Sequence, residues 1–238
     1  MSVREEFDRW AREGRDRGME KRHWRTAKQA LARMPVESGD TVVDLGTGSG
    51  YALRALAETN DGLRGYGVDA SPGMLRNARG YADTPDLGFV SGTFGALPFD
   101  RDAIDHVFSM EAIYYARDLR EALGEIHRVL RPGGTVYCAV DYYAENEYAH
   151  EWDDAVDPDL TLLSREEYRE AFRSAGLYVA GQDNLADRET EIPPEEAFPY
   201  RASDTTVFES REEMIERYRE LGTLLTVGVA PETTEEGT

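Results

Sequence analysis

The chain has 238 residues, of which 40% are hydrophobic and 10% aromatic, so it can bury the core of one α/β domain and is not a disordered chain. Its 47 acidic residues outnumber its 27 basic ones, which gives a net charge of −20. Lys21 and Lys28 are the only lysines. Because so acidic a surface repels phosphate and anionic lipid, we expect no nucleic-acid partner and no membrane partner.

The composition also predicts the environment of the protein. An acidic, lysine-poor surface is typical of salt-loving organisms, where high ionic strength screens self-repulsion; an acidic interaction surface is the alternative. The charged N-terminal segment and the lack of a long apolar run predict a cytoplasmic protein. A single cysteine, Cys138, and four scattered histidines predict neither disulfides nor a metal site.

Apolar residues at helical spacing predict helix over residues 3–34, divided in two near Gly14 and Gly18. After a turn at 36–40, short apolar runs alternate with amphipathic segments, and Ser71 with Pro72 marks one helix start. We expect strands at 41–46, 63–70, 87–92, 106–111, 133–143, 177–186 and 223–231. Helices are expected at 51–59, 71–82, 117–130, 164–176 and 210–221.

This alternation predicts a doubly wound, mostly parallel sheet in one domain, residues 1–230. Residues 187–206, which carry Pro193, Pro194 and Pro199, are predicted to form an irregular insertion, and residues 231–238 a disordered tail. In such sheets a ligand lies beyond the carboxyl ends of the strands.

A glycine-rich loop follows the first strand in "VVDLGTGSG", with glycines at 46, 48 and 50. A dinucleotide fingerprint requires its third glycine at position 51, which is Tyr51, and a phosphate-binding P-loop requires a lysine that is absent here. Asp44 puts negative charge where a pyrophosphate would lie. Asp69, at the end of the second strand, can accept hydrogen bonds from ribose hydroxyls, although a solvated strand-end carboxylate is the alternative. The loop therefore favours a cationic ligand with a ribose, such as S-adenosylmethionine.

Four motifs in register carry a family resemblance: "VVDLGTGSG", "GYGVDAS", "VSGTFGALPFDRDAIDHVFSME" and "EIHRVLRPGGTVYCA". On these motifs the chain resembles class I S-adenosylmethionine-dependent methyltransferases, similar to the ubiquinone- and menaquinone-biosynthesis and type 11 enzymes. The resemblance is strong over residues 38–141. It implies a seven-stranded Rossmann-like sheet with an antiparallel last strand and extra N-terminal helices, and S-adenosyl-L-methionine as cofactor.

The resemblance implies roles for individual residues. The methionine part of the cofactor is expected over the glycine loop and Asp44, the ribose at Asp69, and the adenine between the following strands. The implied cofactor-binding residues are Asp44, Gly46, Thr47, Gly48, Gly50, Asp69, Ala70, Met74, Thr93, Phe94 and Met110. Many relatives carry an aspartate in place of Thr93, so the adenine amino group is expected to have a weaker, uncharged acceptor here.

The resemblance also divides the domain into an N-terminal helical lid at 1–36, a cofactor-binding core at 38–141 and a substrate-side half at 142–230. Trp10, His23 and Trp24 are expected to belong either to the lid or to the core. Methyl transfer by in-line displacement needs mainly alignment of the reactants, so no catalytic triad is required. If the acceptor must lose a proton, Glu111, Tyr114, Tyr115 and His150 are the candidates for that step.

We expect a small-molecule methyl acceptor and a monomer or a homodimer. A non-catalytic S-adenosylmethionine-binding or regulatory module of the same fold is the alternative. Asp105 and His106 are expected to be structural.

Overall fold

The computed structural model describes residues 2–150, 160–202 and 206–232. Its main sheet has seven strands in the order β3-β2-β1-β4-β5-β9-β6. The first five strands in the chain pair in parallel, whereas β9 runs antiparallel to both of its neighbours, β5 and β6. The predicted sheet, with its antiparallel last strand, is confirmed. The strands are β1 (Thr41–Leu45), β2 (Arg64–Asp69), β3 (Leu87–Ser91), β4 (Ile104–Met110), β5 (Leu130–Val140), β6 (Tyr178–Leu185) and β9 (Thr223–Val229).

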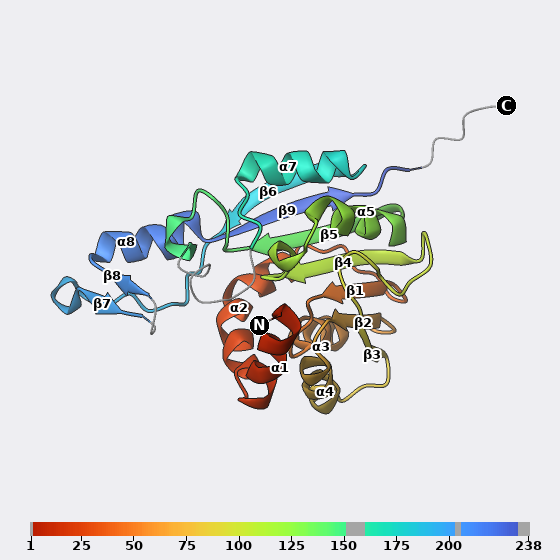
Figure 1. Cartoon of the computed structure of the whole chain (residues 1–238), viewed down its shortest axis with the longest axis horizontal. Coiled ribbons are helices and arrows are strands. Elements are labelled where there is room, and N and C mark those ends of the chain that lie inside the picture. Colours follow the sequence, from red (N-terminus) through yellow and green to blue (C-terminus); the bar gives the residue numbers. More distant parts are fainter. Residues whose placement is uncertain (1, 151–159, 203–205, 233–238) are drawn as a thin grey trace.

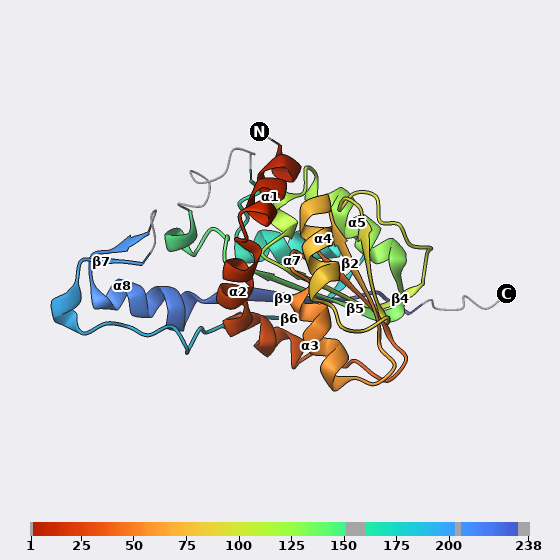
Figure 2. The same ribbon diagram turned by 90° about the horizontal axis from the view of Figure 1, so that it is seen from below.

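Helices cover both faces of this sheet (Figures 1 and 2). On one face α5 and α7 enclose a core that includes Phe172 and Ile126; on the other, α2, α3 and α4 enclose a core around Leu53 and Phe108. Helix α1 packs on α4 at the carboxyl ends of the strands. The helices are α1 (Val3–Arg12), α2 (Asp16–Leu31), α3 (Tyr51–Thr59), α4 (Pro72–Tyr81), α5 (Leu119–Val129) and α7 (Arg165–Ser174), with the short turns η1 (Ile113–Tyr115) and η2 (Glu147–Ala149).

Local sequence signals set several of these boundaries. The Ser71 hydroxyl accepts a hydrogen bond from the Met74 amide at the start of α4, and Pro72 occupies the first helical position, where its missing N–H is not needed. Ser164 and Glu167 form a capping box at the start of α7. Both predicted helix starts are confirmed.

The N-terminal helices divide at only one of the two predicted glycines. Gly14 has a φ of +71° and lies between α1 and α2. Gly18 instead lies inside α2, so the prediction of a break there is wrong. A glycine inside a helix costs only about 1 kcal/mol relative to alanine, which the buried face of α2 offsets.

The insertion is more ordered than the sequence indicates. It contains η3 (Glu195–Ala197) and β7 (Tyr200–Arg201), which pairs with β8 (Val207–Phe208) just beyond the predicted end of the insertion. Helix α8 (Arg211–Ile215) continues into the π-helical segment η4 (Glu216–Leu221), and this part of the chain extends away from the main sheet (Figure 1). Strands of two residues carry too little periodicity to be predicted. The predicted tail from 233 onward lies outside the described residues.

Candidate functional site

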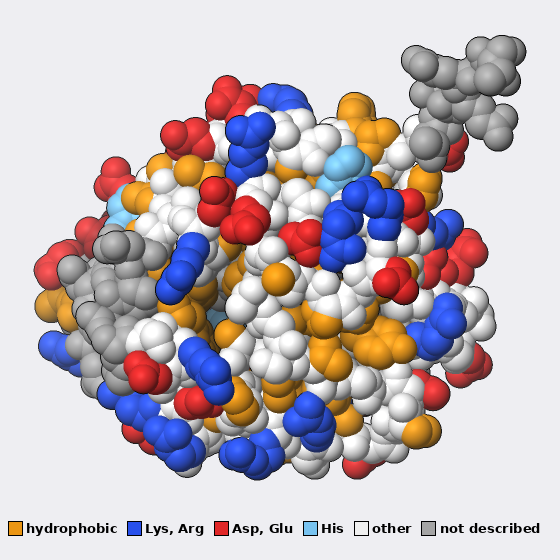
Figure 3. Space-filling model, turned by 45° about the vertical axis from the view of Figure 1, so that its right-hand side comes forward, with side chains coloured by type: hydrophobic (Ala, Val, Ile, Leu, Met, Phe, Trp, Pro, Cys, Tyr) orange, Lys and Arg blue, Asp and Glu red, His pale blue; other side chains and the backbone are white. Residues whose placement is uncertain are grey.

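A cavity of about 660 Å³ opens at the carboxyl ends of β1, β2 and β4. Its walls come from the loops after β1 to β4, and the N-terminal helices α1 and α2 close the remaining side. Its position agrees with the rule for ligand sites in doubly wound sheets. The surface outside is mixed in charge: Figure 3 shows acidic and basic side chains interspersed on one face, with hydrophobic side chains between them.

The three glycines of the loop after β1 all have positive φ, at +73° for Gly46, +51° for Gly48 and +73° for Gly50. A side chain at Gly46 would collide with Ala112. At Gly48 a Cβ would meet nothing within 4 Å, and this residue lines the cavity. The loop backbone at Gly48 is therefore open to close approach by a ligand.

Gly50, the third glycine of the loop, is packed more closely than Gly48. It is absent from the residues that line the cavity, and a Cβ there would lie 2.7 Å from the ring of Phe89. It also begins α3 in the left-handed conformation. Gly50 therefore has a structural role in letting the start of α3 pack closely against Phe89 of β3, and its contact with the cofactor stays a prediction.

Asp44, at the end of β1, lines the cavity and is only 3% exposed. Its Oδ2 accepts a hydrogen bond from the Thr47 hydroxyl at 2.7 Å. Burial raises the pKa of this carboxyl from 3.8 to about 7; the Thr47 hydrogen bond opposes the rise, and the charge of Asp69 adds to it. A carboxylate held in this way attracts a positively charged ligand group.

Asp69, at the end of β2, connects the glycine loop to the next helix. It accepts hydrogen bonds from the amide of Gly48 at 3.0 Å and from the amide of Ser71 at 2.8 Å. Burial raises its pKa to about 6, although these amides act in the opposite direction. It lines the cavity rather than standing in bulk solvent, so lone pairs on its oxygens remain available to ribose hydroxyls.

The other cofactor residues implied by the family also line this cavity. They are Thr47, Ala70, Met74, Thr93, Phe94 and Met110. Met74 is fully buried on α4, and Thr93 forms an isolated bridge with Ala96 in the loop after β3. Ala70, Met74, Phe94 and Met110 thus contribute apolar surface to the cavity, and Thr47 and Thr93 contribute hydroxyls.

Glu111, Tyr114 and Tyr115 lie together at the end of β4 and line the same cavity. Glu111 has a φ of +52°, which is strained for a residue with a side chain and is found most often at functional sites. Its Oε2 accepts a hydrogen bond from the Tyr114 hydroxyl at 3.1 Å, and its Oε1 accepts one from the Asp141 amide. Burial, followed by the charge of Asp141, raises the Glu111 pKa to about 8.

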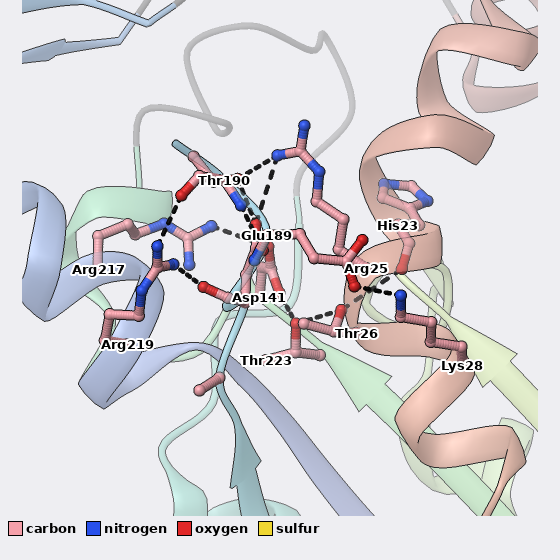
Figure 4. Close-up of polar contacts among 12 residues, drawn as sticks. His23, Arg25, Thr26, Lys28, Asp141, Glu189, Thr190, Arg217, Arg219 and Thr223 are labelled. Carbon is pink, nitrogen blue, oxygen red and sulfur yellow. Dashed lines mark hydrogen bonds and ion pairs between the residues drawn. The ribbon is translucent and has the colours of Figure 1, made fainter. Parts of the chain in front are cut away.

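A polar network behind Glu111 joins three distant parts of the chain (Figure 4). Asp141, at the end of β5, accepts hydrogen bonds from Arg217 of η4 at 2.8 Å and from the Thr223 hydroxyl of β9 at 2.5 Å. The Thr223 hydroxyl also lies 2.9 Å from the hydroxyl of Thr26 on α2, from which it can accept a hydrogen bond. Despite its burial, Asp141 has a lowered pKa because Arg217 and Thr223 favour the charged form.

The aromatic residues of the N-terminal helices differ in their positions. His23 lines the cavity, and burial lowers its pKa to about 3, so its ring is neutral. Trp10 is only 2% exposed and packs against Phe7. Trp24 packs edge-on against Tyr51 at 6.3 Å between ring centroids. Of the three, only His23 reaches the cavity.

Two polar residues are held by structural contacts. Asp105 accepts a hydrogen bond from the Thr41 amide at 2.8 Å and pairs with Arg131. His106 lies within 2.7 Å of the Thr135 hydroxyl and 3.1 Å of Asp40. The contacts of both side chains therefore stabilise the main sheet, which is the structural role that the sequence indicates.

Several residues of the cavity escaped the sequence analysis. They include Arg4, Phe7, Met19, Glu20, Arg22 and Tyr51. Most of them lie on α1 and α2, where only tertiary packing decides which side chains face the ligand. From the sequence, Tyr51 only excluded the dinucleotide fingerprint. Its position directly after the loop glycines could also have indicated a contact with the ligand.

A doubly wound sheet with a glycine loop after β1 and carboxylates at the ends of β1 and β2 defines a Rossmann-like protein of the nucleoside-binding class. The family model described as a methyltransferase domain matches residues 43–138. A protein of Haloferax volcanii, described as a methyltransferase and solved in complex with the Trm112 methyltransferase activator, is 62% identical to this chain. The alignment covers 97% of this chain and 100% of that one, with a TM-score of 0.92. The chain belongs to the class I S-adenosylmethionine-dependent methyltransferase family.

Curated relatives agree with this family. The sterol 24-C-methyltransferase of Saccharomyces cerevisiae is 30% identical over 173 residues, which are 66% of this chain and 44% of the relative. The demethylmenaquinone methyltransferase of Roseiflexus castenholzii is 39% identical over 126 residues, which are 52% of this chain and 50% of the relative. The chain thus spans about half the length of the curated relatives that it matches.

The complex from Haloferax volcanii corrects the predicted partners. We expected a small-molecule acceptor, no nucleic-acid or membrane partner, and a monomer or homodimer, whereas the similar protein is bound to a protein activator. The prediction of the partners was wrong because net charge describes the average surface of a protein and cannot locate a docking site on that surface. The same relative supports the interpretation of the composition as halophilic. Among the residues that the structure describes, no helix is long and apolar enough to cross a bilayer.

Proposed function

We propose that this chain is an enzyme that transfers a methyl group from S-adenosyl-L-methionine to a nucleophilic acceptor atom. The observation that carries the proposal is the presence of Asp44, Asp69 and Glu111 in one cavity beside an open glycine loop. When bound, S-adenosylmethionine supplies an electrophilic methyl group on a positively charged sulfur. The chain itself has to bind the two reactants, align them, and accept the proton that the acceptor atom loses.

The residues on the donor side fit this cofactor. Gly48 leaves open space for a ligand, and Asp69 retains acceptor capacity for ribose hydroxyls. Met74 and Phe94 provide apolar surface for a purine. Asp44 supplies negative charge for the ammonium group or the sulfonium.

On the acceptor side, alignment of the two reactants can contribute about 7–11 kcal/mol of the barrier, so most of the catalytic work is positional. Glu111 is the group that would take the proton lost by the acceptor atom, because its pKa of about 8 lies near the working pH. The Tyr114 hydroxyl orients its carboxylate. Tyr115, which packs edge-on against Phe7 at 5.3 Å, would border the acceptor together with α1.

The proposal includes a protein partner of the Trm112 type. Its support is the relative at 62% identity, which covers nearly the whole of this chain and is bound to such an activator. A protein activator is compatible with a macromolecular acceptor as well as with a small one, so the assay has to sample both.

The test is incubation of the chain, alone and with a co-expressed Trm112-type partner, with methyl-labelled S-adenosylmethionine and fractionated cell extract in high and low salt. We expect label in one acceptor fraction, increased by the partner, and its loss in the Asp69→Ala and Glu111→Gln variants. Binding of S-adenosylmethionine without transfer in any fraction would instead favour a non-catalytic binding module. The proposal fails if S-adenosylmethionine does not bind.

A further inference from the structure

The side chain of Tyr51 carries a hydroxyl that the fold alone does not explain. Tyr51 begins α3 directly after the glycine loop, and its ring packs against Trp24. The hydroxyl oxygen is buried and has no hydrogen-bond partner. Phenylalanine would provide the same packing without burying an unsatisfied polar group, which is unfavourable. Because Tyr51 also lines the cavity, a ligand bound there can supply the partner that this hydroxyl lacks.

The surroundings of this hydroxyl are those of a cation site. Burial and the charges of Asp44, Glu111 and Glu20 raise the pKa of Tyr51 well above its ordinary value. The hydroxyl therefore stays neutral and can both donate and accept a hydrogen bond. Glu20 is already paired with Arg54 at 3.0 Å, so Asp44 and Glu111 are the acids beside this hydroxyl that are left to attract a cation in the cavity.

We propose that the Tyr51 hydroxyl is a binding group for the α-ammonium of S-adenosylmethionine, which it would share with Asp44. This inference rests on the proposed function and assigns one more residue of the same site. An ammonium carries three N–H donors and no acceptor, so it suits a place offering a hydroxyl oxygen and carboxylates. The methionine carboxylate suits this place poorly, because the acidic residues Asp44, Glu111 and Glu20 already act on the hydroxyl.

The same residue then explains why this loop lacks the third glycine of a dinucleotide site. In that fingerprint a glycine allows close packing of the helix on the sheet. Here Gly50, one position earlier, lies against Phe89, and position 51 is free to carry a side chain into the cavity.

The test is calorimetric titration of the full chain and of Tyr51→Phe with four ligands. S-adenosylmethionine, S-adenosylhomocysteine and decarboxylated S-adenosylmethionine all keep the ammonium, whereas 5′-methylthioadenosine lacks it. We expect the variant to bind the first three about 10- to 100-fold more weakly, the range for loss of a hydrogen bond to a charged group, and to bind 5′-methylthioadenosine unchanged.

Tyr168→Phe is the matched control, because the Tyr168 hydroxyl is also buried without a partner but lies outside the cavity. We expect this variant to bind all four ligands as the wild type does. Thermal unfolding of the two free variants should show that neither loses its fold.

The outcomes are distinguishable. Equal binding of S-adenosylmethionine by wild type and Tyr51→Phe overturns the inference and leaves the proposed function intact. A loss that disappears with decarboxylated S-adenosylmethionine assigns the hydroxyl to the carboxylate and overturns the ammonium assignment. Absence of binding by the wild type overturns the proposed function and the inference with it.

Discussion

Replacement of Asp44 by asparagine should uncouple cofactor binding from pH. The Asp44 carboxyl is 3% exposed, and burial raises its pKa from 3.8 to about 7. Below pH 7 the free protein therefore keeps a proton on this group. A ligand ammonium or sulfonium beside it favours the carboxylate and expels that proton. The affinity for S-adenosylmethionine should consequently rise with pH until Asp44 ionises in the free protein.

The size of the effect follows from this pKa. Well below the pKa, release of one proton per bound ligand changes the affinity about tenfold per pH unit. Because half of Asp44 is already ionised at pH 7, binding should strengthen about 50-fold between pH 5 and pH 7. The Asp44→Asn variant has no ionisable group at this position, so it should lose this dependence and bind weakly throughout. The pH dependence of the affinity that remains in this variant should come from Asp69 and Glu111, whose pKa values of about 6 and about 8 are also raised.

The stability of the free protein should respond in the opposite direction. Because the folded-state pKa of Asp44 is raised, the folded protein binds the proton more tightly than the unfolded chain does. The contribution of Asp44 to the free energy of unfolding is then fully present below pH 3.8. It is lost as the pH rises towards 7, by about 4 kcal/mol at 1.36 kcal/mol per pH unit. At pH 8 the Asp44→Asn variant should therefore unfold at a higher temperature than the wild type.

Calorimetric titration at pH 6 in two buffers of different ionisation enthalpy measures the released protons directly. We expect the wild type to release about one proton more than Asp44→Asn. Equal proton release by the two proteins, or a wild-type affinity that is flat from pH 5 to pH 7, would refute the assignment of a protonated Asp44 in the free cavity.

Three further predictions concern the loop, the acid at the end of β4 and the network behind it. Gly46→Ala should lower the free energy of unfolding by about 2 kcal/mol or more in denaturant titration, because Ala112 blocks the Cβ, whereas Gly14→Ala, with a similar φ but nothing within 4 Å, should cost less. With a labelled acceptor fraction, the rate of methyl transfer by the wild type should rise with pH towards about 8, where Glu111 becomes ionised. The Glu111→Gln variant should transfer the methyl group at least about 100-fold more slowly, and its rate should no longer rise with pH. A pH profile of the variant that matches the wild type would exclude Glu111 as the base. Arg217→Met should cost about 3 kcal/mol in unfolding free energy at pH 7 by leaving Asp141 without its ion pair. The check is that this loss becomes smaller as the pH falls far enough to protonate Asp141, whose pKa Arg217 helps to hold below its usual 3.8 in the wild type.

The sequence by itself determined the fold class of this protein and the edge of the sheet at which its site lies. Continuous apolar runs alternating with helical patterns are local signals, and the rule for parallel strands joins them into one sheet. The loop after β1, Asp44 and Asp69 were predictable as well, because the carboxyl ends of parallel strands meet at one edge whatever the remaining topology. The methyl donor follows from these positions.

Tertiary structure decided how the cavity is completed. Arg217 lies 76 residues from Asp141 in the chain, and Thr223 lies 197 residues from Thr26, so no local pattern could have joined them. Whether Gly50 faces a ligand or Phe89, and whether His23 or Trp24 enters the cavity, depends on how α2 and α3 pack on the sheet. The orphan hydroxyl of Tyr51 likewise became visible only once its neighbours were known, because an unsatisfied hydrogen bond is a property of the folded surroundings and not of the residue.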